Sequence, residues 1–187
     1  MNDALFVDLQ HVAETMRQLH FHDDGATPNS PLPVIRYHLR SKPGSDMAAA
    51  FEALFNRNQW TPLWRAGIFD YHHYHSTAHE ALAVVRGEAR VTLGGQSGQT
   101  LSIAVGDVLV LPAGTGHRCV ESSRDFLVVG AYPRGQEDYD IQRPGSASHA
   151  DSKARIARVA LPLADPVAGR DGPLMVAWKA SGSARGE

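Results

Sequence analysis

The chain has 187 residues, of which 43% are hydrophobic and 20% are charged, and its formal net charge is −2. This length predicts one domain with a substantial core, because a chain of about 150 residues buries roughly 70% of its surface on folding. The near-neutral charge provides no basic field, so we expect neither nucleic acid nor an anionic membrane as a partner.

The single cysteine, Cys119, excludes an intramolecular disulfide and fits a reducing compartment. The segment Met1 to Gln10 has no basic cluster before an apolar run, so it does not resemble a secretory signal. No apolar stretch reaches the roughly 18 residues that a membrane span needs. The sequence therefore predicts a cytoplasmic, water-soluble protein.

The first third of the chain predicts three elements. Apolar residues recur at three to four residue intervals within residues 1–19, which indicates a helix. Residues 21–33 are rich in Asp, Gly, Asn and Pro and predict a loop. Residues 34–39 predict an edge strand.

A second helix is predicted over residues 47–56, with Ser45 or Asp46 as its N-cap. Met47, Phe51, Leu54 and Phe55 fall on one face of such a helix. We expect this apolar stripe to pack against the rest of the domain.

After Trp60 the pattern changes to apolar and polar residues in alternation, interrupted by glycine turns about every ten residues. Short strands at this spacing are typical of a sandwich or a barrel. The predicted strands are residues 80–85, 88–93, 101–105, 108–111 and 126–132.

The last third is less regular. Residues 133–153 are polar and predict a loop-rich segment, and residues 156–163 predict one last strand. Residues 174–178 are apolar enough to be anchored on the domain, and residues 180–187 predict a frayed tail.

Histidine carries the clearest chemical signal, because four of the ten histidines fall between Tyr71 and Glu80. His73 and His75 are two residues apart, so a strand would place both side chains on one face. Glu80 follows at an odd spacing, and it can face back toward the pair only if a turn intervenes. The Ser-Thr-Ala sequence at residues 76–78 suits that turn.

A third imidazole comes from a distant segment. Pro112, Gly114 and Gly116 predict a tight turn that delivers His117 onto a new strand. Three imidazoles and one carboxylate suit one divalent Fe, Mn, Ni, Zn, Co or Cu ion better than calcium or magnesium. Four protein ligands also leave room for a substrate or water.

These residues resemble the two motifs of the cupin family. The first motif, G-x5-H-x-H-x4-E-x6-G, is filled by Gly67, His73, His75, Glu80 and Gly87. The second motif, G-x5-P-x-G-x2-H-x3-N, is filled by Gly106, Pro112, Gly114 and His117, with Glu121 in place of the last Asn. The resemblance implies metal binding through His73, His75, Glu80 and His117.

The flanking sequence is similar to one subgroup, the uncharacterised YjlB-like cupins. The similarity rests on residues 23–25, 64–65, 67–72, 129–133, 165–167 and 172–174. It implies an all-β fold, a cupin double-stranded β-helix or jelly-roll barrel, with a short helical N-terminal extension. The expected division is an extension (1–60), a core with the motifs (61–133), a C-terminal segment packing back (134–179) and a tail (180–187).

Several roles stay open at this point. His79 could replace Glu80 as the fourth ligand, could orient it, or could serve as a general acid or base. Tyr71 and Cys119 share strand parity with metal-site histidines and are predicted to line a substrate pocket. Arg65 is a further candidate, because its guanidinium could steer an anionic substrate.

The pattern predicts a metal-dependent enzyme that acts on a small oxygenated molecule, as a dioxygenase, isomerase or decarboxylase. The alternative is a non-catalytic cupin that binds a small ligand or a metal for sensing or storage. A homodimer is expected, since cupins often form one. The sequence contains no phosphate loop, dinucleotide fingerprint or nucleophile elbow.

Overall fold

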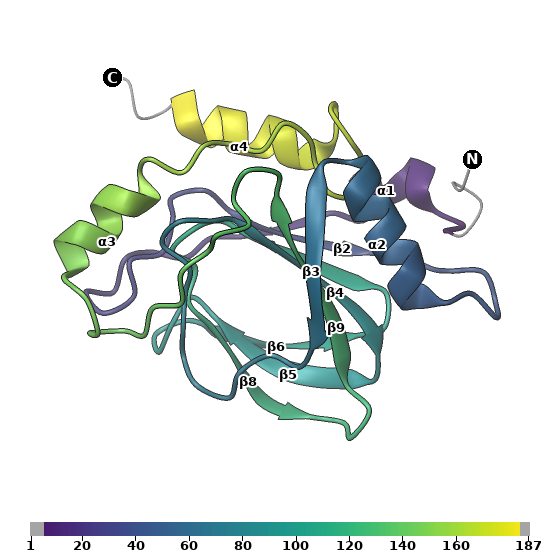
Figure 1. The fold of residues 1–187 in the computed structure, drawn as a ribbon, viewed down its shortest axis with the longest axis horizontal. Coiled ribbons are helices and arrows are strands. Elements are labelled where there is room, and N and C mark those ends of the chain that lie inside the picture. The colour runs from purple at the N-terminus through teal and green to yellow at the C-terminus, as the bar shows by residue number, and fades with distance from the viewer. Residues whose placement is uncertain (1–5, 184–187) are drawn as a thin grey trace.

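A computed structural model describes residues 6–183 of the chain (Figure 1). Nine strands form two sheets that lie face to face. The larger sheet has the order β1-β2-β7-β4-β9-β3 and the smaller one the order β6-β5-β8. The strands are β1 (Arg17–Leu19), β2 (Val34–His38), β3 (Trp60–Ala66), β4 (Glu80–Arg86), β5 (Glu88–Leu93), β6 (Gln99–Ala104), β7 (Asp107–Leu111), β8 (His117–Ser122) and β9 (Leu127–Pro133).

The strand pairs are antiparallel, and the two sheets make a jelly-roll sandwich rather than the closed barrel that the sequence predicted. The chain passes from one sheet to the other at sharp turns. Gly87 lies between β4 and β5 with φ of 67°, and a Cβ there would lie 2.2 Å from Ser123 Oγ. Only glycine fits such a turn without strain, which explains the Gly at this motif position.

Strand β4 separates two hydrophobic cores because successive side chains point to opposite faces. Leu82 and Val84 point into the space between the sheets. Ala81 and Ala83 point to the outer face of the larger sheet, which helices cover. This alternation fixes the direction of every residue near the start of β4.

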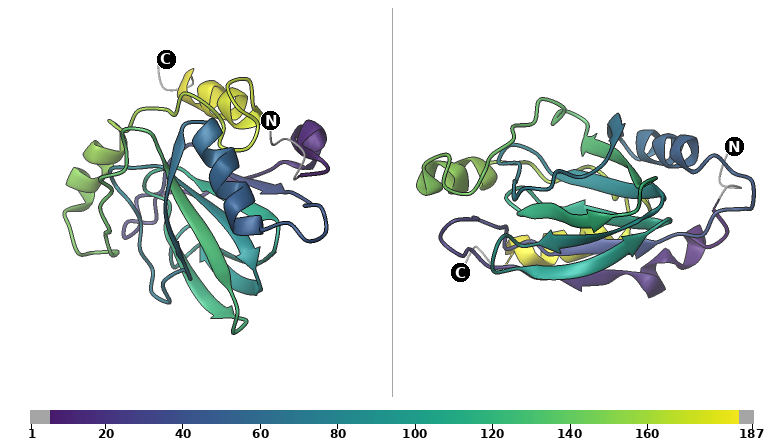
Figure 2. Two further views of the ribbon diagram at one scale, coloured as in Figure 1. Left: turned by 45° about the vertical axis from the view of Figure 1, so that its right-hand side comes forward. Right: turned by 90° about the horizontal axis from the view of Figure 1, so that it is seen from below.

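Helix α2 (Met47–Arg57) covers part of that outer face, as Figure 2 shows. Asp46 caps it by accepting hydrogen bonds from the backbone N–H groups of Ala48 and Ala49. Phe51, Leu54 and Phe55 are buried, so the predicted helix and its apolar stripe are confirmed.

The N-terminal extension is only partly helical. Residues 1–5 of the predicted helix lie outside the described residues. Leu9–His11 is a 3₁₀ helix (η1) and Val12–Thr15 a single helical turn (α1), but Arg17–Leu19 is strand β1. It pairs with β2, so β2 is an inner strand and its prediction as an edge strand was wrong.

The C-terminal third differs most from expectation. The predicted strand over residues 156–163 does not form, because helix α3 (His149–Ile156) ends where it should begin and coil follows. Helix α4 (Pro173–Ser183) extends into the predicted tail, of which residues 184–187 lie outside the described residues. Anchoring of residues 174–178 is confirmed, since the buried Trp178 donates its Nε1–H to the Pro33 carbonyl over 2.8 Å.

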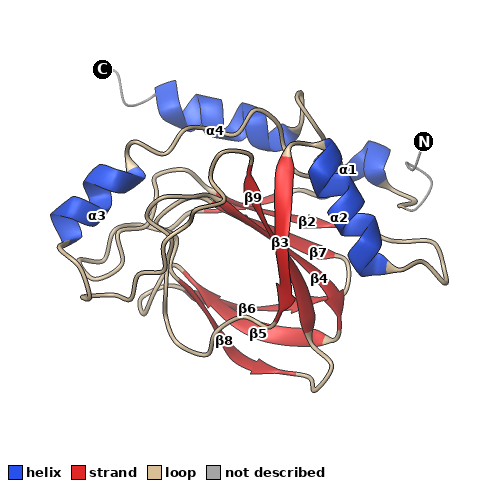
Figure 3. Cartoon of the chain, in the orientation of Figure 1, coloured by secondary structure: helices blue, strands red, loops and turns tan. Residues whose placement is uncertain are grey.

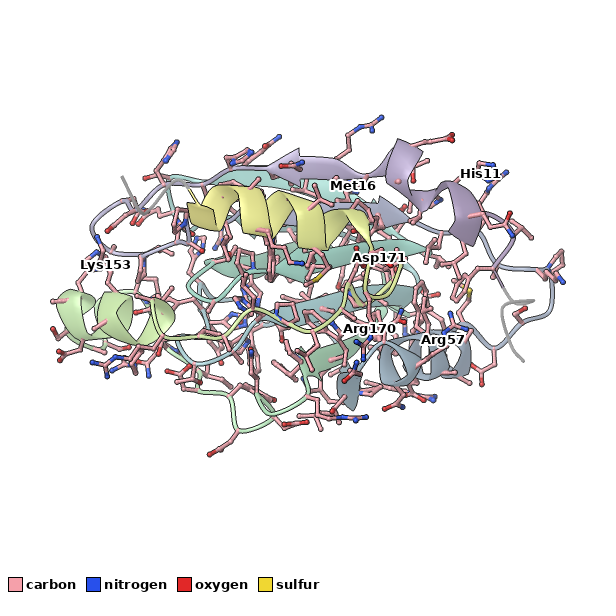
Figure 4. The ribbon with its side chains drawn as sticks, turned by 90° about the horizontal axis from the view of Figure 1, so that it is seen from above. His11, Met16, Arg57, Lys153, Arg170 and Asp171 are labelled. Atoms are coloured by element: carbon pink, nitrogen blue, oxygen red, sulfur yellow. The ribbon has the colours of Figure 1, made fainter. Side chains whose placement is uncertain are left out.

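Loops gather at one end of the sandwich, toward α3 (Figure 3). Helix α4 crosses the larger sheet, and Lys153 of α3 lies at the end of the molecule beside the N-terminal loop (Figure 4). None of the described helices combines the length and apolar character that crossing a bilayer requires.

Candidate metal centre

The segment His73–His75 is extended and held on both sides by backbone hydrogen bonds. His73 exchanges N–H···O=C bonds of 3.1 and 2.9 Å with His117, the first residue of β8. Tyr74 exchanges two bonds of 2.9 Å with Gln142 of the loop after β9. His73 and His75 therefore share one face, as predicted, and the ring centroids of His73 and His117 lie 4.0 Å apart.

Each of these histidines is oriented by a backbone carbonyl. The Nδ1 atoms of His73 and His117 lie 3.2 Å and 3.0 Å from the carbonyl oxygens of Tyr71 and Thr115. Nδ1 of His75 contacts the carbonyl of Asp140 in the same way. A carbonyl only accepts, so each Nδ1 carries a proton and each Nε2 presents its lone pair.

The ligand atoms of His73, His75 and His117 all lie within 4.8 Å of one another, and all three side chains are buried. Burial, aided by the nearby His117, lowers the pKa of His73 to about 3. Its imidazole is thus neutral near pH 7 and free to act as a ligand.

Glu80 completes the group from the first position of β4, because the alternation of that strand directs it between the sheets. Its Oε1 lies 3.3 Å from His75 Nε2 and its Oε2 lies 3.2 Å from His117 Nε2. Neither pair has hydrogen-bond geometry, and His75 Nε2 and Glu80 Oε2 lack a hydrogen-bond partner among the described residues.

This arrangement fits a divalent cation. A carboxylate buried to 2% exposure needs a compensating positive charge. Burial alone would lower the pKa of His75, but the Glu80 carboxylate raises it, so the group attracts either a proton or a metal ion. Three imidazole nitrogens with a carboxylate are donors that suit a transition metal.

Asp140 supports the site from the loop after β9. Its carbonyl orients His75, while its carboxylate accepts from the backbone N–H of Ser76 over 2.6 Å and of Thr77 over 3.2 Å. The carboxylate also accepts from the Ser76 hydroxyl over 2.5 Å. One residue therefore holds both a candidate ligand and the turn that separates His75 from Glu80.

Glu80 has its own supporting groups. The Tyr132 hydroxyl of β9 donates to Glu80 Oε1 over 2.5 Å and accepts from Trp64 Nε1 over 3.0 Å. The ring of Tyr139 stacks on Tyr132 with centroids 4.0 Å apart. These contacts fix Oε1, while Oε2 keeps no hydrogen-bond partner among the described residues.

The candidate metal centre opens into a cavity of about 220 Å³. The three histidines and Glu80 lie on its wall. The remaining lining residues are Trp64, Ala66, Gly67, Ile68, Phe69, Leu82, Tyr132, Tyr139 and Ile141.

His79 does not reach this cavity, contrary to the prediction that it ligates, orients or exchanges protons there. As the neighbour of Glu80 it points to the opposite face, where its ring lies 4.7 Å from that of Trp178. Its Nδ1 accepts the Ala113 N–H over 2.9 Å. Burial lowers its pKa to about 3, against a smaller opposite effect of the Ala160 carbonyl. His79 is a buried, neutral structural residue.

The three predicted pocket residues also lie elsewhere. Tyr71 stacks on Phe69 and carries the Arg143 guanidinium 3.8 Å above its ring. Cys119 packs in the core between the sheets, where burial raises the pKa of its thiol. Arg65 forms a bidentate ion pair with Glu52 of α2, at 2.6 and 2.8 Å. None of the three lines the cavity. Strand parity failed for Cys119, which lies deeper along β8, and for Tyr71, which lies in a loop, and the charge of Arg65 is taken up by Glu52.

Trp64, Tyr132, Tyr139 and Asp140 were not among the predicted site residues. Tyr132 could have been found, because β9 pairs with β4 and an inward aromatic there must approach Glu80. Tyr139 and Asp140 lie in a segment without regular periodicity, so no local signal indicated them.

Comparison with known proteins identifies the family of the chain. The Cupin domain family matches residues 66–129, which include all four candidate ligands. The "Uncharacterized protein YjlB" of Bacillus subtilis is 39% identical over 159 residues, covering 84% of this chain and 93% of its own length. The chain is a YjlB-like cupin.

Solved structures show weaker, partial likeness to this cupin. A mutant of Bacillus subtilis oxalate decarboxylase OxdC matches 59% of this chain with 20% identity and a TM-score of 0.32. Vicilin from tomato matches 60% with 16% identity and a TM-score of 0.34. The YjlB-like cupin spans only about a quarter of the length of either protein, at 23% and 25%.

Proposed function

We propose that this cupin is a metal-dependent enzyme of dioxygenase type that acts on a small oxygenated molecule. The observation that carries the proposal is the convergence of three Nε2 lone pairs and one carboxylate oxygen without a hydrogen-bond partner at the wall of the cavity. His73, His75, His117 and Glu80 would hold the metal.

The bound metal would supply a Lewis-acid centre that can take up a substrate oxygen or O2. The chain contributes orientation and exclusion of water. Tyr132 holds Glu80 in place, and the carbonyls of Tyr71, Thr115 and Asp140 hold the imidazoles. The aromatic and aliphatic walls would favour exclusion of water when a ligand binds.

The choice of dioxygenation follows from the scarcity of proton-transfer groups. Apart from the four candidate ligands, Tyr132 and Tyr139 are the ionisable side chains among the described residues that line the cavity. Burial, reinforced by Glu80, raises the pKa of Tyr132 far above neutrality. Decarboxylation and isomerisation gain from positioned protein proton donors or acceptors, which this lining largely lacks, whereas insertion of both atoms of O2 into a substrate needs no added reductant.

The test has two stages. Metal content of untagged protein is measured by mass spectrometry beside the His73→Ala/His75→Ala variant, with about one equivalent of transition metal expected in the wild type and a loss of metal in the variant. Iron-loaded protein is then assayed for O2 uptake and for ¹⁸O incorporation on a panel of small enols, phenols and diketones. Absence of metal after reconstitution overturns the proposal. Metal without any turnover on the panel identifies the non-catalytic binder instead.

A further inference from the structure

The walls of the cavity indicate what kind of molecule enters it. Lys, Arg and Asp are absent from its lining among the described residues, and Glu80 is the sole formal charge. The lining residues other than the candidate ligands are aromatic, aliphatic or glycine. Apolar walls of this kind favour an apolar body and leave polar recognition to a few groups.

Three arginines near the site, Arg65, Arg143 and Arg155, have contacts outside the cavity, and Arg118 does not line it. The Arg143 guanidinium lies 3.8 Å from the Tyr71 ring centroid, and Arg65 pairs with Glu52 on the far side of β3. Arg155 donates to the hydroxyls of Ser76 and Ser152 over 2.7 and 3.1 Å. Beyond the proposed metal, the described lining offers no cationic side chain, so a second carboxylate that does not reach the metal would be costly to bury.

The mouth of the cavity is apolar as well. Phe69 and Ile141 line it and are each 46% exposed, and they come from two different loops. The volume of about 220 Å³ exceeds the roughly 150 Å³ of a cavity that holds benzene. One aromatic ring with a short substituent therefore fits.

We propose that the ligand of this cavity is a neutral or singly charged molecule with an aromatic or aliphatic body and one oxygen-bearing head group, and that dicarboxylates are rejected. The inference rests on the proposed function for the position of the head group, which lies at His73, His75, His117 and Glu80. Trp64, Phe69 and Ile141 receive the apolar body.

The experiment compares benzohydroxamate, acetohydroxamate and oxalate on Co(II)- or Mn(II)-loaded protein by titration calorimetry. The two hydroxamates share a head group and differ in the phenyl ring. The ratio of their dissociation constants therefore measures how much the apolar walls contribute to binding. Burial of the ring predicts benzohydroxamate binding at least tenfold tighter than acetohydroxamate, and tighter than oxalate. Equal binding of the hydroxamates, or tighter binding of oxalate, overturns the inference.

A matched pair of variants tests the charge argument. Ile141→Arg places a cation at the mouth and is expected to raise oxalate affinity about tenfold while weakening benzohydroxamate. Val120→Arg is the control, because Val120 is 42% exposed on β8 and does not line the cavity. No gain in oxalate affinity for Ile141→Arg, or the same gain for Val120→Arg, contradicts the inference.

Failure of the proposed metal centre can be distinguished from failure of the apolar-ligand inference. Metal content is measured first, and a protein that retains no metal disproves the metal centre alone. The phenyl preference is then read in metal-free protein from tryptophan emission, as the difference between the wild type and Trp64→Phe, because Trp64 is the tryptophan that lines the cavity and two others lie elsewhere. A preference that persists there supports the apolar-ligand inference, and its absence overturns it.

Discussion

Two cavities of nearly equal size lie on opposite sides of the chain where His79 leads into Glu80, the first residue of β4. Glu80 faces the cavity of about 220 Å³ at the candidate metal centre, and His79 faces one of about 210 Å³ beneath α3 and α4. Both histidine-containing walls are buried, yet their chemistry differs. In the first, imidazole Nδ1 atoms face carbonyl oxygens and the Nε2 lone pairs converge. In the second, Nδ1 of His79 already accepts the N–H of Ala113.

The comparison teaches that the backbone group facing a histidine decides what that histidine can do. Where a carbonyl faces Nδ1, Nδ1 carries the proton and the lone pair of Nε2 is free to bind a metal. Where a backbone N–H faces Nδ1, the lone pair of Nδ1 accepts that hydrogen bond and Nε2 carries the proton. Sequence proximity to the metal motif therefore says little about the role of His79.

The largest effect is expected for Glu80→Gln. The substitution removes the one formal charge of the metal centre and leaves the Tyr132 hydroxyl beside a neutral amide. Metal affinity should fall by more than the roughly 10–100-fold typical for loss of a supporting hydrogen bond. Competition with a coloured chelator measures the affinity. Retention of wild-type affinity would show that the carboxylate is not a ligand.

Asp140→Ala should come next. It releases the turn at Ser76 and Thr77 and loosens the loop whose carbonyl orients His75. We expect metal affinity to fall roughly 10–100-fold, with a change in the Co(II) absorption spectrum that reports altered geometry. Asp138→Ala is the control, because Asp138 is exposed in the same loop. Equal effects of the two variants would contradict a specific role for Asp140.

His79→Leu should separate stability from metal binding. The Ala113 N–H loses its acceptor in the interior, which costs about 1–3 kcal/mol of the free energy of unfolding. Metal content should stay at the wild-type level. Chemical denaturation and metal analysis of the same preparation give both quantities, and a loss of metal at unchanged stability would return His79 to the metal centre.

The smallest effect concerns an ion pair that holds α3 to the N-terminal loop. Asp23 contacts Lys153 Nζ over 2.7 Å and His149 over 2.9 Å. Burial alone would raise the pKa of Asp23, but the hydrogen bonds from Lys153, the Gly25 N–H and His149 hold it well below its usual range. The stabilisation is therefore present above about pH 4, the ordinary Asp pKa, and is lost as pH falls below it.

Lys153→Met should accordingly be less stable than the wild type at neutral pH by at most about 1 kcal/mol, because the pair is near the surface. The difference should shrink in acid, as Asp23 takes up a proton in both proteins. Urea midpoints at neutral and acidic pH provide the measurement. A difference that grows in acid would contradict the assignment.

The sequence was most informative where spacing and periodicity act directly. Alternation in β4 and the His-x-His pair predicted the strands, the shared face of His73 and His75, and the approach of His117. The site's support was not predictable in the same way. Asp140 acts through its backbone carbonyl, which every residue has, so no residue type at that position signals the role.

The pocket predictions failed for a related reason. Parity along a strand specifies a face of the sheet but not the distance from the open end of the sandwich. Cys119 shares a face with His117, yet it lies two residues deeper, within the packed core. Helix α3 was missed because it is short and polar, with Ser152 as its buried residue, and helix α4 because its apolar residues do not gather on one marked face.

The backbone pairing of Tyr74 with Gln142 has a consequence for the order of assembly. Three candidate ligands lie between residues 73 and 80, and the fourth is His117. The backbone contacts that hold the segment His73–His75 in place come from Asp140 and Gln142. During synthesis from the N-terminus, the binding motifs therefore emerge well before the segment that rigidifies them. A nascent chain that stops short of Gln142 would carry every candidate ligand and still lack a preorganised centre. If the proposed metal binds, its tight loading would therefore belong to a late stage of the protein's maturation.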